Sequence, residues 1–459
     1  MMPVALPLLV LLGSLAADDG QVQYVNPKAD EAAFVFLVNG EIPKEATAKA
    51  WVPIPREWEN QRGVKIRSIK PTPTSKGTEP RHRFAYGFWQ FAKGSPARTR
   101  RIELRFSFTC YEVNATVEPK RLPPFDRTKD LYPLYTKTEP HIELTEEVKK
   151  LARSIVGSQE NPYLQARALY DWILDHMTYG WRKGYGLKYA MEEMRGDCGQ
   201  HGVMFIGLCR ALGIPARGVY GFMAFPPGPE SREFMPHGWA EFYVPGHGWL
   251  PCDPAVGRNP GKARHTSKPD LSLRDYYFGN LDNQRLIFSK GNNPNLSPRT
   301  ADKPEPFIQV GAVRYVPEPE RSPKLHFDLV IGPRQEDVSQ LLSDPKREST
   351  SARIYRFIEM LRPADSAAAL RRKHPELFRE AKGVVVVMVL PGSQAERAGL
   401  KTGDIILKYN GASLNGVQDV ERHSVSEEQK RFGLVILRGE QKIRIQVHGG
   451  KLGVGLSDF

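Results

Sequence analysis

The sequence predicts a multidomain protein with an N-terminal β-sandwich, a central α+β domain and a small C-terminal β-barrel with helices. The chain has 459 residues, more than a single hydrophobic core usually contains. Its composition, 40% hydrophobic and 25% charged, is typical of globular proteins and excludes disordered and collagen-like classes. Apolar residues alternate with polar ones in several runs of the first part and recur at helical spacing in the middle, and the last part begins with a strand-length apolar run, a turn and a short helix. We expect domains at 19–135, 136–332 and 381–459, with a helical linker at 333–380.

Residues 1–17 have the pattern of a secretory signal peptide. The apolar run 4–12 is shorter than the roughly 20 residues of a membrane span, and the small residues Ser14 and Ala16 follow it. We therefore expect cleavage after Ala16 or Ala17, a secreted or periplasmic location, and no stable membrane span after cleavage. No Lys or Arg precedes the run, so an uncleaved anchor is the alternative.

Basic residues outnumber acidic ones and give a net charge of +13. They occur in short clusters such as 98–101 and 371–373, and no nucleic-acid-binding motif accompanies them. We therefore expect no nucleic-acid partner. A basic surface favours anionic partners, such as acidic polymers of the cell envelope, and a solvated basic face is the plainer alternative.

The four cysteines, Cys110, Cys198, Cys209 and Cys252, are too few for a disulfide framework in a chain of this length. Their spacing matches no metal site, and no acidic cluster resembles a calcium loop. We therefore expect no metal and no cofactor. Cys110 and Cys209 are expected to be buried free thiols.

Strand-length apolar runs fill the first domain. They lie at 34–38, 48–53, 64–69 and 102–108, and several alternate apolar with polar residues. Pro and Gly punctuate these runs, as in a sandwich of short antiparallel strands with one solvated face.

The central part begins with helices and continues with strands. Asn161-Pro162 starts a helix, and a later helix begins at Cys198 and ends at Gly213 and Pro215. The buried stripe of this later helix is expected at Met204, Phe205, Leu208 and Leu212. Strands follow at 217–222, 237–242 and 249–253, which gives an α+β arrangement. Residues 257–330 carry only short β-like pieces, such as 325–330.

Cys198 is a candidate nucleophile because it begins a helix. The N-terminus of a helix supplies positive potential and free N–H groups, which favour the thiolate. Gly196 and Gly199 would let backbone N–H groups approach a developing oxyanion, and Trp181 and Gln200 are candidate side-chain donors to it. An inert buried thiol is the alternative for a lone cysteine in this position.

His237 and Asp253 are the candidate base and orienting carboxylate. His237 begins an alternating strand, residues 245–248 form a turn, and Asp253 ends the returning strand. Both side chains can face Cys198 only if the residue paired with Asp253 is an even number of positions from His237. A loop of two or four residues fails this condition, whereas a five-residue loop pairs Asp253 with Trp239. The sequence therefore predicts an odd loop or a bulge between the two strands.

Several motifs resemble those of the transglutaminase-like superfamily of cysteine enzymes. They lie at 196–200, 210–217, 237–241 and 248–254, within a stretch of roughly 145–255. The resemblance implies a papain-like α+β core with Cys198 as nucleophile, His237 as general base and acid, and Asp253 as orienting carboxylate. It also implies a thioester formed from a protein or peptide amide, which either water or an amine then resolves. His201, on the first turn of the Cys helix, is expected to be a partly exposed structural residue.

The last part of the chain resembles a PDZ domain of the bacterial envelope-protease type. The matching pieces are a strand at 384–390, a turn at 391–393, a short helix at 395–400, a strand at 403–407 and a tight turn at 410–411. The resemblance implies capture of a C-terminal peptide ligand at a sheet edge, with a purely structural docking role as the alternative. Residues 452–456 are a candidate displaced carboxylate-binding loop, and the tail 457–459 is a candidate ligand for self-association.

The sequence thus predicts an exported transglutaminase-like cysteine enzyme that hydrolyses or transamidates protein or peptide amides, with a PDZ module that recruits substrate or partner. The alternative is a catalytically idle scaffold that binds peptides. The presence of Cys198, His237 and Asp253 together favours the enzyme, because idle relatives usually lose one of them.

Overall fold

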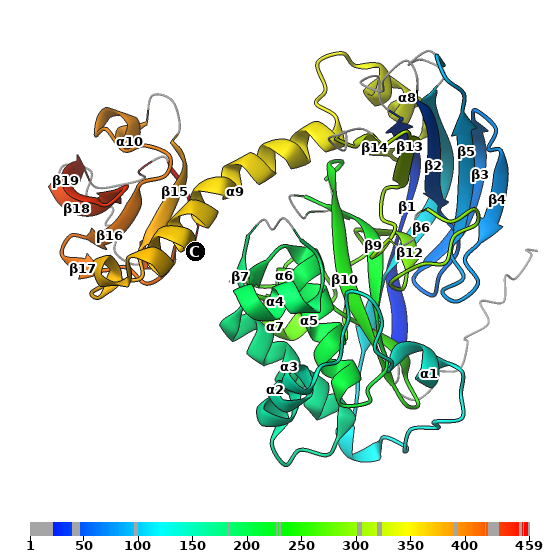
Figure 1. Cartoon of the computed structure of the whole chain (residues 1–459), viewed down its shortest axis with the longest axis horizontal. Coiled ribbons are helices and arrows are strands. Elements are labelled where there is room, and N and C mark those ends of the chain that lie inside the picture. Colours follow the sequence, from blue (N-terminus) through cyan, green and yellow to red (C-terminus); the bar gives the residue numbers. More distant parts are fainter. Residues whose placement is uncertain are drawn as a thin grey trace, which may run out of the picture.

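The computed structural model describes residues 22–457 apart from short internal gaps (Figure 1). The gaps cover residues 39–45, 96–99, 181–183, 226–227, 229–230, 260, 301–304, 319–323, 390–392, 418, 421–430, 449–451 and 453. The expected signal peptide, Trp181 and the last two residues of the chain therefore lie outside the described residues. Within the described ranges, no helix combines the length and the hydropathy needed to cross a membrane.

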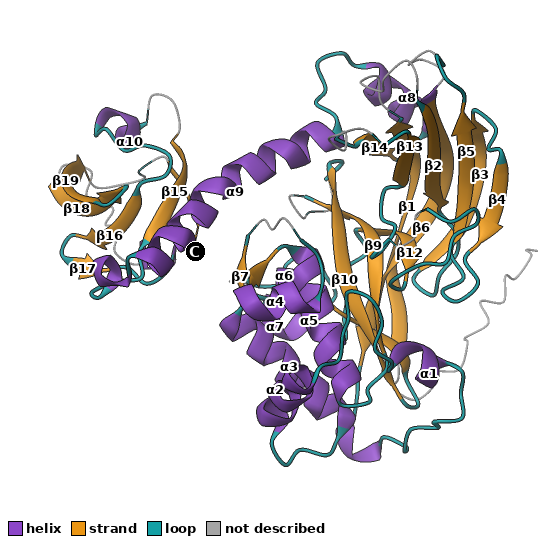
Figure 2. Cartoon of the chain, in the orientation of Figure 1, coloured by secondary structure: helices purple, strands orange, loops and turns teal. Residues whose placement is uncertain are grey.

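Two four-stranded antiparallel sheets share one hydrophobic core in the N-terminal domain (Figure 2). The first has the order β14-β1-β6-β3, with bounds His326–Gly332, Val22–Leu37, Arg101–Ala115 and Gln61–Lys70. The second has the order β13-β2-β5-β4, with bounds Ala312–Val316, Thr47–Ile54, Ala85–Phe91 and Ser75–Thr78. Alternate residues of β6 are buried, including Ile102, Leu104 and Phe106, as expected for a strand with one solvated face.

The structure corrects the predicted extent of the central domain, because residues 312–332 return to the N-terminal sheets. Strand β13 pairs with β2, and β14 pairs with β1 so that Phe327 lies opposite Phe36. The predicted boundary at 332 followed chain order. Pairing between segments so far apart in the sequence leaves no local pattern from which it could be predicted.

Helices α2 to α7 lie together beside the central sheet, and α1 lies apart from them (Figure 1). Their bounds are Leu131–Tyr135 for α1, Glu146–Val156 for α2, Pro162–His176 for α3, Leu187–Glu193 for α4, Cys198–Ala211 for α5, Pro254–Gly257 for α6 and Leu273–Tyr276 for α7. Every residue of α5 from Gln200 to Arg210 is buried. The expected stripe is therefore only part of the contact surface of α5, because helices α2, α3, α4 and α6 and strands β9 and β10 surround it. Leu212, expected in the stripe, follows the helix and is half-buried.

The central sheet has the order β11-β10-β9-β12, with bounds Gly248–Cys252, Phe234–Val244, Ala216–Ala224 and Arg285–Lys290. Its residues contribute to two different cores. Phe242 of β10 packs with the helices, whereas Phe222 of β9 and Phe288 of β12 pack against Phe34 of β1 at ring distances of 5.9 and 5.0 Å. The sheet that carries the site is thus packed against both the helices and the N-terminal domain.

Two helices connect the N-terminal sheets to the C-terminal domain. They are α8 (Gln335–Ser343) and the long helix α9 (Thr350–Lys373), which runs to the C-terminal domain (Figure 1). Asp365 of α9 accepts a hydrogen bond from Nε of Arg195 at 2.8 Å, and Phe357 of α9 packs edge-on against Phe225. These contacts fix α9 against the central domain.

The C-terminal domain contains a twisted sheet and the short helix α10 (Gln394–Arg397). Its strand order is β19-β18-β16-β15-β20, with β17 paired to β16. The bounds are Val384–Val389 for β15, Ile405–Tyr409 for β16, Ala412–Ser413 for β17, Arg431–Arg438 for β18, Gln441–His448 for β19 and Val454–Ser457 for β20. Asn410 and Gly411 both have positive φ, 48° and 81°, which confirms the predicted tight turn. Strand β20 forms one edge of the sheet, antiparallel to β15.

Candidate active site

Cys198 is the first residue of α5 and directly follows the short strand β8 (Arg195–Gly196) and Asp197. The Asp197 side chain caps the helix, because it accepts a hydrogen bond from the Gln200 N–H at 3.1 Å. Strand β8 pairs in parallel with β7 (Thr178–Tyr179), which fixes the approach to the helix. The half-buried thiol therefore lies at the positive end of a rigid helix, while Cys110, Cys209 and Cys252 are buried free thiols elsewhere.

Strands β10 and β11 are joined by an odd loop, residues 245–247, which confirms the predicted register. The loop is three residues long rather than five, but the pairing is the same. The last pair of the hairpin is Ala240 with Cys252, so the next pair in this register is Trp239 with Asp253. Asp253 is therefore diagonal to His237 on the same face of the sheet. The hairpin thus brings the two candidate residues to the same side of the sheet.

The structure brings all three candidate site residues together. Nε2 of His237 lies 2.8 Å from Oδ2 of Asp253, and the Cys198 side chain lies close enough to the ring to raise its pKa. Burial lowers the pKa of His237, but the Asp253 carboxylate and the Cys198 side chain together outweigh burial and raise the pKa to about 9. Burial raises the pKa of Asp253, while His237 and Arg285 lower it more and hold it well below its ordinary value. At neutral pH an imidazolium therefore lies between the sulfur and a carboxylate.

Arg285 of β12 donates to the same oxygen of Asp253 as His237, and sequence reasoning missed it. Its Nη1 donates to Oδ2 of Asp253 at 2.7 Å, and its Nε donates to Oδ2 of Asp282 at 2.9 Å. The arginine is only 1% exposed, and its guanidinium lies over the rings of Trp239 and Tyr277 at 5.5 and 5.2 Å. Arg285 lies within the stretch 257–330, where apolar residues show no clear helical or strand spacing. Its place at the site is therefore visible only in the structure, through the pairing of β12 with β9.

Gln200 and His201, on the first turn of α5, are both engaged in local structure. The Gln200 side chain donates to the Gly184 carbonyl and accepts from the Gly186 N–H, both at 3.1 Å, and so holds the loop before α4. The expectation of a partly exposed His201 is wrong, because its ring is fully buried and stacks on Tyr179 at 5.8 Å. Burial lowers the pKa of His201 to about 4, so this ring is neutral near pH 7.

Tyr179 is a polar side chain at the site that the sequence did not reveal. Its hydroxyl group lies close to the backbone of Cys198. Burial, and then the proximity of Cys198 and Asp197, raise the pKa of Tyr179 well above its ordinary value, so it remains a neutral phenol. The pairing of β7 with β8, which places it here, has no local sequence signal.

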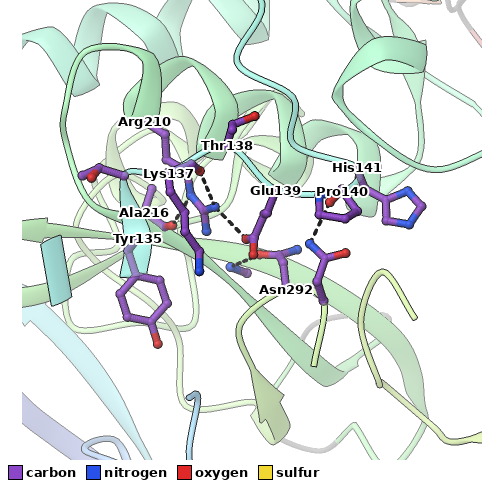
Figure 3. A network of polar contacts seen from close by, with 12 residues as sticks. Tyr135, Lys137, Thr138, Glu139, Pro140, His141, Arg210, Ala216 and Asn292 are labelled. Atoms are coloured by element: carbon purple, nitrogen blue, oxygen red, sulfur yellow. Dashed lines mark hydrogen bonds and ion pairs between the residues drawn. The ribbon is translucent and has the colours of Figure 1, made fainter. Parts of the chain in front are cut away.

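The far end of α5 is anchored by Arg210 (Figure 3). Its Nε donates to the Ala216 carbonyl at 2.9 Å, and its Nη1 donates to Oε1 of Glu139 at 2.7 Å. Nδ2 of Asn293 in turn donates to the Pro140 carbonyl at 2.7 Å. These contacts tie the C-terminal turn of α5 to the segment that precedes α2, so Cys198 is also fixed along the helix axis.

A cavity of about 670 Å³ opens beside His237. Tyr179 and His237 line it from the central domain, Phe357 lines it from α9, and Leu456 lines it from β20. Its volume is in the usual range for specific ligand sites. The cavity thus joins the candidate active site to the edge strand of the C-terminal domain.

Comparison with known proteins assigns two parts of the chain. The model of the transglutaminase-like superfamily matches residues 149–254, and a PDZ domain model matches residues 385–438. An uncharacterised protein of Haemophilus influenzae is 25% identical over 351 residues, which cover 67% of this chain and 93% of that protein. Serine protease HTRA1 of Xenopus tropicalis is 33% identical over 101 residues, 22% of each chain.

Among solved structures, a proposed cysteine protease from Cytophaga hutchinsonii has a TM-score of 0.43 and 16% identity, over 72% of this chain and 95% of that chain. The motif at Cys198, His237 and Asp253 lies inside the first matched stretch, and strands β15 and β16 lie inside the second. The chain therefore contains a transglutaminase-like core at residues 149–254 and a PDZ domain at residues 385–438.

Proposed function

We propose that the protein is a cysteine enzyme that acts on protein or peptide amides through a thioester intermediate. The observation that carries the proposal is the 2.8 Å hydrogen bond from Nε2 of His237 to the Asp253 carboxylate, with the Cys198 side chain close enough to raise the pKa of the same ring. In this proposal Cys198 is the nucleophile, His237 is the general acid and base, and Asp253 orients the ring and stabilises its charge. The match to the transglutaminase-like superfamily over 149–254 supports it.

The first half of the proposed reaction forms the thioester. The Cys198 thiolate attacks the amide carbonyl carbon, and the oxygen takes up the negative charge near the N-terminus of α5 and the Tyr179 hydroxyl. The C–N bond then breaks, and the His237 imidazolium gives its Nδ1 proton to the leaving amine, since Nε2 faces Asp253. The products are an acyl-enzyme and a free amine.

The second half returns the enzyme to its starting state. Neutral His237 removes a proton from water or from an acceptor amine, which attacks the thioester carbonyl carbon. The C–S bond breaks, and the thiolate and imidazolium are restored. Water as acceptor gives hydrolysis and an amine gives transamidation; both share the same residues up to this step.

The PDZ domain is proposed to recruit the substrate or a partner, and the protein is proposed to work outside the cytoplasm. Edge strand β20 offers backbone groups to an extended peptide, which is how PDZ domains bind C-terminal ligands. The apolar run at 4–12 and the small residues after it support export as a secreted or periplasmic protein.

The test uses β-casein as a probe substrate for the full-length protein, with and without dansylcadaverine as acceptor amine. New casein amino groups indicate hydrolysis, and fluorescent casein indicates transamidation. We expect one of these products from the wild type and none from Cys198→Ser. Cys209→Ala, which changes a buried thiol on the same helix, is expected to retain the product. If wild type and Cys198→Ser give equal product, or neither gives any, the idle peptide-binding scaffold is favoured.

A further inference from the structure

The cavity beside His237 has a positively charged rim. Arg258, Lys262, Arg264 and His265 all line it, and all four belong to the segment that follows α6. Arg258 is half-buried, and the other three are exposed. Three permanent cations and an imidazole therefore lie around one opening.

Acidic groups in the described part of the chain leave the charges of Lys262 and Arg264 largely uncompensated. Asp282 lines the same cavity, but its Oδ2 already accepts from Nε of Arg285 and from the Tyr277 hydroxyl, both at 2.9 Å. Lys262 lies 3.9 Å from Asp270, a side chain that is 99% exposed, and such a pair is weak. The rim can therefore attract an anionic ligand.

Apolar side chains line the same cavity. Phe225 of the central domain and Phe357 of α9 lie edge-on to each other with ring centroids 6.3 Å apart, and both line the cavity. Met235 of β10 and Leu456 of β20 line it too. The lining thus combines basic groups with aromatic and aliphatic groups, together with the His237 ring.

We propose that this cavity binds an extended acidic peptide, so that the amide presented to Cys198 lies close to carboxylate side chains. The carboxylates would contact the basic rim formed by Arg258, Lys262, Arg264 and His265, and apolar side chains of the same peptide would contact Phe225 and Phe357. Charge complementarity of this kind selects partners and accelerates their encounter. This inference rests on the proposed function and adds the substrate class to it.

The test measures binding to full-length Cys198→Ala, so that turnover plays no part. The probes are two fluorescein-labelled hexapeptides, Leu-Glu-Gln-Leu-Glu-Leu and its counterpart with Lys in place of Glu, compared by fluorescence anisotropy in low salt. We expect the acidic peptide to bind at least tenfold more tightly. Adding Arg258→Gln, Lys262→Gln or Arg264→Gln singly is expected to weaken its binding by about 1.5- to 5-fold, the usual effect of an exposed ion pair. The triple variant is expected to lose about tenfold or more. Lys150→Gln, which removes an exposed charge on α2, is the matched control and should change nothing.

Equal binding of the two peptides, or an equal loss with Lys150→Gln, would overturn the proposal. Thermal unfolding of each variant excludes misfolding as the cause of a loss. Failure of this inference is separable from failure of the proposed function. Charge-selective binding without turnover by the wild type contradicts the enzyme only, whereas turnover of amides without charge selectivity contradicts the acidic-peptide site only.

Discussion

Replacing His237 with alanine is expected to lower amide turnover by about 10⁴-fold or more. The substitution removes the group that protonates the leaving amine and the imidazolium that stabilises the thiolate, and loss of the base in a comparable triad costs this much or more. Binding of substrate is expected to change little, because the ring lies at one edge of the cavity. The measurement is kcat and KM on a casein-derived peptide for wild type and His237→Ala.

His247→Ala is the matched control for this prediction. His247 lies in the hairpin turn that joins β10 to β11, and its ring nitrogens are 3.3 Å from the carbonyl oxygens of Pro245 and Thr116. Its removal is expected to leave kcat within about twofold, since the change touches only exposed turn contacts. A kcat for His237→Ala within tenfold of the wild type would contradict the role assigned to this ring.

Replacing Arg285 with methionine is expected to lower the free energy of unfolding by about 3–5 kcal/mol. The change leaves the buried carboxylate of Asp253 and the half-buried carboxylate of Asp282 without their shared cation, and breaking a buried ion pair from one side typically has this cost. Calorimetric unfolding of the two proteins is the measurement. Arg67→Met is the control, because the Arg67–Glu31 pair has the same 2.7 Å length but an exposed arginine, and no measurable change is expected.

The pH dependence of this loss has a definite sign. Arg285 and His237 lower the pKa of Asp253 from its ordinary 3.8, so the stability that Asp253 contributes is present above about pH 4 and is lost as pH falls towards its folded pKa. The deficit of Arg285→Met should therefore be largest near neutral pH and should shrink below pH 4. A deficit that is constant from pH 7 to pH 3 would show that lost packing, rather than the ion pair, is responsible.

The placement of Cys198, His237 and Asp253 could be predicted because local patterns set it. A capping Asp197 and flanking glycines mark the start of α5. The hairpin between His237 and Asp253 is short, and the condition that both side chains share one face restricts its register. The PDZ strands and the turn at 410–411 were predictable for the same reason.

Long-range pairing explains what the sequence did not predict. Arg285 and Tyr179 reach the site only through the pairing of β12 with β9 and of β7 with β8, which no local period encodes. The return of 312–332 to the N-terminal sheets is the same kind of contact. The ring of His201 stacks on the ring of Tyr179. Because the position of Tyr179 was not predictable from the sequence, the burial of His201 was not predictable either.

Alkylation by iodoacetamide, followed by intact-protein mass spectrometry across pH, tests the central claim most directly. Because the pKa of His237 is raised to about 9, its imidazolium lies beside the sulfur throughout pH 6–8. The other thiols are buried, and Cys198→Ala identifies any contribution from them. The account predicts a single rapid alkylation of the wild type at pH 6, nearly as fast as at pH 8, and a rate for His237→Ala that is much lower at pH 6. Identical pH profiles for wild type and His237→Ala would contradict an activated Cys198.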